Sequence, residues 1–122
     1  KIGDSWNKFA GSRNIPYLGV AAHIDWVEKH KASVPKLFAA YREAADWVVA
    51  NPEAAAKLIS PKGNAEDQKA IADLIRANDR LGLNIRWASD VKKEIQSVYA
   101  AARAIDFFPG EPSAASIYEG NK

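Results

Sequence analysis

The first continuous apolar run of the chain covers residues 17–22, which are apolar or small and carry no charge. The run lacks helical periodicity and is bounded by Pro16 and His23. A short uncharged run of this kind is typical of a strand that is buried on both faces. The pattern therefore predicts a buried strand over residues 17–22.

Beyond His23 the apolar positions take a helical period. Residues 23–30 fit two helical turns, with acidic residues early and lysines late, as the helix dipole favours. A longer helix is predicted over residues 33–50, where Ser33 is a suitable N-cap and Pro35 is tolerated in the first turn. Its apolar stripe advances in steps of three and four. The stripe consists of Val34, Leu37, Phe38, Tyr41, Ala45 and Val48.

Two asparagines mark the next helix starts. Asn51 precedes Pro52, an order that caps a helix and places proline at its first position, so a helix is predicted over residues 52–59. Asn64 is expected to cap a fourth helix, which Gly82 ends.

The last helix is expected to be capped by Ser89. Before it, residues 83–88 alternate apolar and polar positions, which predicts a short extended segment. Residues 1–16 are expected to form a short helix or an irregular segment, and residues from Asp106 onward an irregular arm.

These patterns together predict a mainly α fold with about five helices and one or two short strands. One buried strand cannot form a sheet by itself, because both of its edges need partners. We therefore expect the other strands of the sheet to lie outside this sequence. A self-contained helical bundle, with the strand misassigned, is the alternative.

Composition excludes several kinds of chemistry. The chain has 122 residues, of which 17 are basic and 15 acidic, and it contains no Cys. Disulfides, thiolate catalysis and cysteine metal sites are therefore excluded. The two histidines are seven residues apart and match no zinc motif, and the net charge of +2 is too small and too dispersed to favour nucleic acid. No motif for a nucleophile or a phosphate loop occurs, so we expect neither catalytic residues nor a cofactor or metal.

Three residues are candidates for ligand binding. His23 follows the predicted strand, at the kind of junction where such sheets expose ligand sites, although a helix-capping or merely exposed histidine is the simpler interpretation. Arg86 and Trp87 together offer a cation and an aromatic face to an anionic ligand. The simpler interpretation is an arginine stem lying over a packed indole. Trp26 and Trp47 are expected to be core or packing residues.

The order of these elements resembles a known family. A short helix containing Trp-Val-Glu-Lys-His at 26–30 is followed by a long Ala-rich helix, by Asn-Pro-Glu-Ala-Ala-Ala at 51–56, by a capped helix, by Ile-Arg-Trp at 85–87 and by a last helix. Over about residues 15–105 this order is similar to the C-terminal half of solute-binding proteins of ABC transporters, of the nitrate/sulfonate/taurine type. Its most specific part runs from Phe38 to Ile59.

The resemblance implies a fragment of a two-lobed α/β periplasmic-binding-protein fold of type II. Residues 1–22 would then return from the second lobe with the buried strand, and residues 23–122 would pack on the first lobe. Because the sequence begins with Lys1, we expect it not to be the complete translation product.

The implied function is binding of a small ligand, anionic or sulfonated or aromatic, between two lobes that close and deliver it to a membrane permease. The implied location is the periplasm, or the outer face of a membrane as an anchored lipoprotein. A homodimer is expected if these residues fold alone. A helical module that binds another protein, without a small ligand, is the alternative function.

Overall fold

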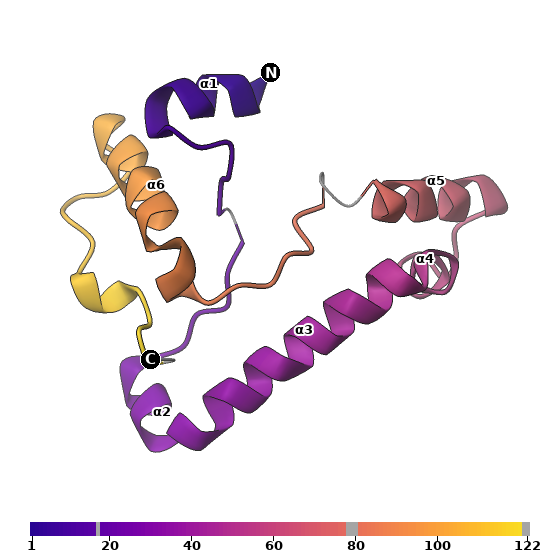
Figure 1. Ribbon diagram of the computed structural model, residues 1–122, viewed down its shortest axis with the longest axis horizontal. Coiled ribbons are helices and arrows are strands. Elements are labelled where there is room, and N and C mark those ends of the chain that lie inside the picture. Colours follow the sequence, from indigo (N-terminus) through magenta and orange to yellow (C-terminus); the bar gives the residue numbers. More distant parts are fainter. Residues whose placement is uncertain (17, 78–80, 121–122) are drawn as a thin grey trace. The chain divides into compact units, whose positions relative to one another are not determined.

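The computed structural model describes residues 1–16, 18–77 and 81–120, which form six α-helices and three short 3-10 turns (Figure 1). Among these residues no strand occurs. The chain divides into two compact units. One comprises Lys1–Val27 with Arg86–Lys122, and the other comprises Glu28–Ile85. The boundary between them falls within α2 (Ile24–Lys29).

The unit Glu28–Ile85 is built around the longest helix. It contains the 3-10 turn η1 (Lys31–Ser33), α3 (Val34–Ala50), α4 (Pro52–Ile59) and α5 (Ala65–Arg76). The predicted helix over residues 33–50 is confirmed nearly to the residue. Ser33 occupies the expected position, but its hydroxyl makes no capping hydrogen bond, because its backbone is already helical.

The junction between α3 and α4 is a single residue, Asn51. Its side-chain amide donates to the carbonyl oxygen of Trp47 at 2.9 Å, and its backbone N–H donates to the same oxygen at 2.9 Å. Asn51 therefore satisfies the end of α3 and does not cap α4 with its side chain. Pro52 follows at the first position of α4, where its missing N–H costs nothing.

Helices α4 and α5, which are joined by residues 60–64, pack against each other and bury a small core, and this helix pair is called the hairpin below. The Asn64 side chain accepts from the Asp67 N–H at 2.9 Å, and the Asp67 carboxylate accepts from the Asn64 N–H at 3.4 Å, which completes a capping box. The Gln68 amide donates to the carbonyl oxygens of Ser60 and Gly63, and so ties down the loop. Buried between the helices are Ala55, Ala56, Ala72 and Ile75. Alanine allows the two backbones to approach closely, so Ile75 supplies the large buried side chain.

The other unit begins with α1 (Ile2–Ala10), which ends at Gly11 in the left-handed conformation, φ 68°. The Trp6 indole N–H donates to the carbonyl oxygen of Asn14 at 3.0 Å, so the chain folds back beneath the helix. The unit also contains the 3-10 turn η2 (Ala88–Val91), α6 (Lys92–Ala104) and the 3-10 turn η3 (Ala114–Ser116).

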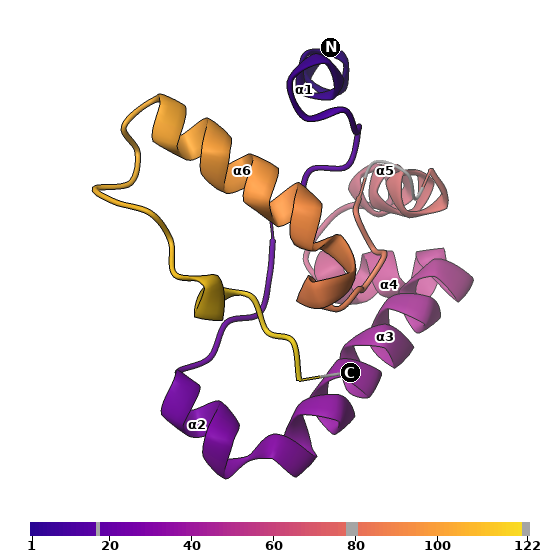
Figure 2. The ribbon, with the colours of Figure 1, turned by 60° about the vertical axis from the view of Figure 1, so that its left-hand side comes forward.

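After α6 the chain reverses and runs back alongside the helix (Figure 2). The reversal is a Schellman motif: the Asp106 N–H donates to the Arg103 carbonyl at 3.0 Å, and the Phe107 N–H donates to the Ala102 carbonyl at 2.9 Å. Asp106 takes the left-handed position of this motif, with φ 54°. Residues 107–120, here called the C-terminal arm, return to the start of α6 and place the buried Ile117 there.

Both strand predictions are wrong for the described residues. Residues 18–22 are exposed and lie outside any helix or strand, with Leu18 84 % exposed, while Tyr17 lies outside the described residues. Residues 83–87 are irregular, and Ala88 belongs to η2. The physical reason is that a strand needs a partner for its backbone groups, and the described residues offer none.

Two helix boundaries also differ from the prediction. Helix α5 ends at Arg76, before Gly82, and residues 78–80 between them lie outside the described residues. Ser89 lies inside η2, and α6 begins two residues later than a Ser89 cap requires, at Lys92. About five helices were expected and six are present in the described residues, because the undecided segment 1–16 contains α1.

Candidate functional site

His23, the first of the three candidate ligand residues, is exposed directly before α2. Its carbonyl oxygen accepts from the Val27 N–H at 3.1 Å, so its backbone forms the first turn of that helix. This contact gives the position a structural role at the helix start. A ligand role for its imidazole stays a prediction.

Arg86 and Trp87 lie in the irregular segment before η2. Arg86 is exposed, whereas Trp87 is half-buried and its ring packs on Tyr118, with centroids 6.0 Å apart and planes tilted by 35°. The Trp87 carbonyl oxygen accepts from the Asp90 N–H at 3.0 Å and so begins η2. One face of Trp87 therefore has a packing role, and binding of an anion by this pair stays a prediction.

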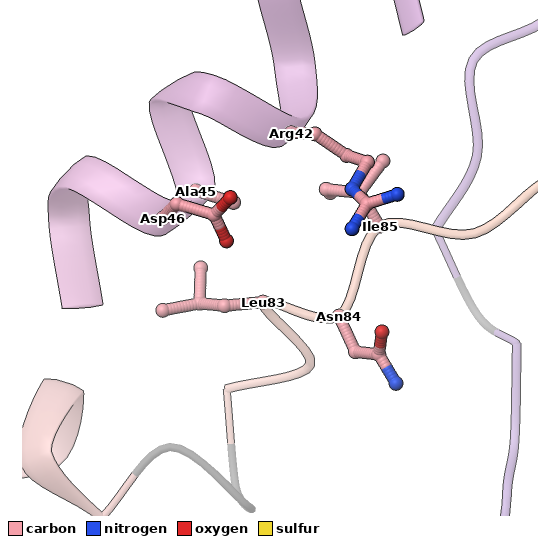
Figure 3. A pocket seen from close by; sticks show the side chains of 6 residues that line it. All are labelled: Arg42, Ala45, Asp46, Leu83, Asn84 and Ile85. Carbon is pink, nitrogen blue, oxygen red and sulfur yellow. The ribbon is translucent and has the colours of Figure 1, made fainter. Parts of the chain in front are cut away.

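A small hollow in the unit Glu28–Ile85 is lined by none of these three residues (Figure 3). One wall comes from α3 and the other from the segment that follows α5. It is lined by Arg42, Ala45, Asp46, Leu83, Asn84 and Ile85. Figure 3 shows Asp46 directed toward Leu83, and the Arg42 side chain extending to the chain near Ile85.

The chemistry of this hollow is mixed. Arg42 and Asn84 supply hydrogen-bond donors, and Asp46 supplies an acceptor of opposite charge. The Arg42 guanidinium carbon lies 6.0 Å from the centre of the Phe38 ring, within range of a cation–π interaction. The volume is about 70 Å³, far below the ~300 Å³ at which ligand pockets begin. The hollow can hold a few water molecules but not an organic solute.

A larger hollow of about 460 Å³ lies open along the side of α3. All of its lining residues, from Phe38 to Asp46, belong to this one helix. A ligand seated there would touch one wall and keep much of its hydration, whereas small-molecule sites bury most of the ligand. Neither hollow is therefore an enclosed ligand site.

The sequence predicts part of this arrangement and misses the rest. Arg42 and Asp46 are one turn apart and lie off the apolar stripe, so their common side of α3 follows from helical spacing. Residues 83–85 reach that side through a tertiary contact, for which the local sequence carries no signal.

The charged residues of the hairpin form a separate exposed cluster. Asp73 accepts from Lys69 at 2.7 Å and from Arg76 at 2.8 Å, and Arg76 also pairs with Glu53 of α4. The hydrogen bond to Asp73, together with its negative charge, raises the pKa of Lys69 above its ordinary value. These pairs join α5 to α4 but face solvent, so they contribute little to stability.

Many large apolar side chains are exposed on the helices of the unit Glu28–Ile85. Leu37, Tyr41, Trp47, Val49, Leu58, Ile59 and Leu74 form this exposed apolar set. Trp47 is 43 % exposed, and Trp26 of α2 is also exposed, so neither indole is a core residue of the described chain, and packing of these indoles against another lobe stays a prediction. A residue exposed here is not covered by its own unit.

Within the described part of the chain, no three acidic or histidine side chains gather as metal ligands, and no helix has the length and apolar character to cross a membrane. Comparison with known proteins finds no matching family model, no matching curated protein and no matching solved structure.

Proposed function

We propose that this chain is the C-terminal part of the solute-binding component of an ABC importer, of the nitrate/sulfonate/taurine type. The observation that carries the proposal is the helical series α2, α3, α4, α5 and α6, in the order that the resembled family has there. The junction of α3 and α4 at Asn51–Pro52, within the most specific part of the resemblance, supports it further. The two extended members of the series are absent as strands from the described residues.

The exposed apolar set supports the same proposal. In a two-lobed receptor these helices would pack against the first lobe, which would cover side chains such as Leu58, now 72 % exposed. The small volumes of the two hollows fit a scaffold whose ligand contacts come largely from another lobe. Covering by a lobe would account for the exposure of these apolar side chains.

In the proposed mechanism no bond is made or broken. A small anionic, sulfonated or aromatic solute contacts both lobes and therefore stabilises the closed state, which the permease then recognises. His23, Arg86 and Trp87 are the residues of this chain that we propose to contact the ligand. Arg86 would pair with the negative group and Trp87 would offer its aromatic ring to the apolar part. The protein would act in the periplasm, or outside the cell as a membrane-anchored lipoprotein.

The test uses the complete product of the gene that encodes this chain. Its unfolding temperature is measured in the presence of each of five solutes: nitrate, taurine, an alkanesulfonate, an aromatic acid and a pyrimidine. We expect one class to raise the temperature by several degrees, since a ligand at 100 times its Kd adds about 2.7 kcal/mol. The Arg86→Gln variant is expected to lose the shift for an anion, and Arg13→Gln serves as the control.

A second function, a helical module that binds another protein, is favoured by one specific observation. Leu37 and Tyr41 lie one turn apart on α3 and are both exposed, as the anchors of a helix that docks in a groove are. The receptor proposal is wrong, and the protein-binding function is correct, if two results are obtained together. No solute raises the unfolding temperature of the gene product, and Leu37→Ala abolishes its binding to a defined protein.

A further inference from the structure

The C-terminal arm is held by contacts to α6 and to the segment before it, all within one unit. Ile117 is buried, and Tyr118 packs on Trp87. The Tyr99 hydroxyl lies 3.2 Å from the Ser116 hydroxyl. Lys92, the first residue of α6, pairs with Glu119. Each contact joins an arm residue to a residue on the other side of the reversal at Asp106.

The chain between α6 and these contacts has the properties of a hinge. Asp106 holds a left-handed backbone, φ 54°, which an L-residue other than glycine adopts at a cost. Residues 107–113 contain Pro109 and Pro112, and have no helix or strand. Proline restrains this segment toward an extended backbone, in which the arm would point away from its own helix.

Few buried contacts hold the C-terminal arm in its closed position. Among the described residues of this unit, Ile117 is the one that is buried. The ion pairs of Lys92 with Glu119 and of Arg103 with Glu111 are exposed on both sides. Exposed pairs contribute little, so detaching the arm exposes mainly Ile117, one face of Tyr118 and the side of Phe108 that packs on Tyr99. Segments with so few buried contacts open at low cost.

From these three observations we propose that the C-terminal arm exchanges between two copies of this chain. Each arm then packs on α6 of the other copy. There Ile117, Tyr118 and Glu119 make the same contacts that they make within the closed chain. The exchange forms a closed two-fold dimer without any new interface. In the exchanged form Asp106 is free to adopt an ordinary extended backbone, which offsets part of the cost of association. The proposal does not depend on the proposed transport function.

The test is a mixed-isotope cross-link. Chains labelled with 14N and with 15N are unfolded together, refolded at high protein concentration and separated by size. A zero-length carbodiimide reagent then joins Lys92 to Glu119, and mass spectrometry reads the isotope of each half of the joined peptide. In the dimer we expect about half of these pairs to be mixed, as random exchange requires. Absence of a dimer, or a dimer in which every pair carries one isotope, overturns the proposal.

Hinge variants give a second, independent readout. Asp106→Gly fits the closed reversal without strain, and we expect its dimer to be about tenfold weaker, which corresponds to about 1.4 kcal/mol. Asp106→Pro cannot adopt a positive φ, so we expect the dimer to dominate. Gly110→Ala is the matched control in the same hinge, since a methyl group there meets nothing within 4 Å, and its dimer should match that of the original chain. An Asp106→Gly dimer as strong as the original contradicts the hinge argument even if Asp106→Pro does not fold.

Discussion

At the scale of single residues, Asp106 shows how a helix can end without glycine. The Schellman hydrogen bonds are complete, and an aspartate occupies the position at which glycine is the common choice. At the end of α1 the equivalent left-handed residue is Gly11. The two helix ends therefore solve the same geometric problem with different residues and at different cost.

We expect Asp106→Gly to stabilise the monomer by about 0.5–1 kcal/mol, because the left-handed backbone then carries no Cβ penalty. Urea unfolding of dilute protein measures the change. The converse substitution, Gly11→Asp, should lower the free energy of unfolding by a similar amount. A loss of stability in Asp106→Gly would show that the aspartate side chain compensates its backbone.

Ile75 of α5 and Trp47 of α3 are expected to respond differently to truncation. Ile75 is 1 % exposed, so Ile75→Ala should cost about 3–4 kcal/mol through lost burial and a cavity. Trp47→Ala should cost only about 1 kcal/mol, because much of the indole already faces solvent. Equilibrium unfolding of the isolated chain measures both. A Trp47 value as large as that of Ile75 would mean that the indole is covered in solution.

At the scale of secondary structure, the sequence predicts a helix start well where the side chain of the N-cap residue hydrogen-bonds to the first turn of the helix. Asn64 is the clear case, with both hydrogen bonds of a capping box. Ser33 and Asn51 stand at helix starts as expected, but their side chains do not cap, since Ser33 has a helical backbone and Asn51 turns to the preceding helix. The position of a capping residue in the sequence predicts where the helix starts. The backbone conformation at that residue determines whether its side chain makes the capping hydrogen bond.

We expect Asn64→Ala to destabilise the hairpin of α4 and α5 by about 1 kcal/mol, as the loss of an N-cap does. Ser33→Ala is the matched control at a helix start without a side-chain cap, and it should change stability by less than about 0.5 kcal/mol. Thermal unfolding followed by circular dichroism compares the two. Equal losses in both variants would contradict the assignment of the caps.

The strand predictions failed for a reason that belongs to the same scale. Leu18 and Val20 have the residue types of a buried strand, but a strand is stabilised by hydrogen bonds to a neighbour and by covered faces. The sequence of residues 17–22 does not show whether a neighbouring strand or a covering layer is present. Helices α3 to α5 satisfy their own backbone groups, which is why periodicity and caps predict them from local sequence.

At the scale of the whole chain, burial is uneven between the two units. The hairpin of α4 and α5 holds Ala55, Ala56, Ala72 and Ile75, whereas the described part of the other unit buries Ile117 alone. The candidate ligand residues could be proposed from chemistry and resemblance. The hollow between α3 and residues 83–85 could not, since it arises from packing across more than thirty residues of sequence.

We expect hydrogen exchange to reproduce this difference. Amides of α5 near Ile75 should be the slowest to exchange, and those of residues 18–22 and of the C-terminal arm the fastest, because opening free energies follow buried contacts. Mass spectrometry of peptides from the labelled chain measures the order. Strong protection of residues 18–22 would reveal a backbone partner for them and restore the strand prediction.

The junction at Pro52 has a genetic consequence. The residue before a proline is held out of the helical region, and this barrier keeps α3 and α4 from continuing as a single rod. The codons of proline and alanine differ by one base, and alanine is the strongest helix former. One point mutation therefore removes this barrier, and we expect the resulting chain to favour a continuous helix through Asn51, in which the alanines of the hairpin core move away from Ile75.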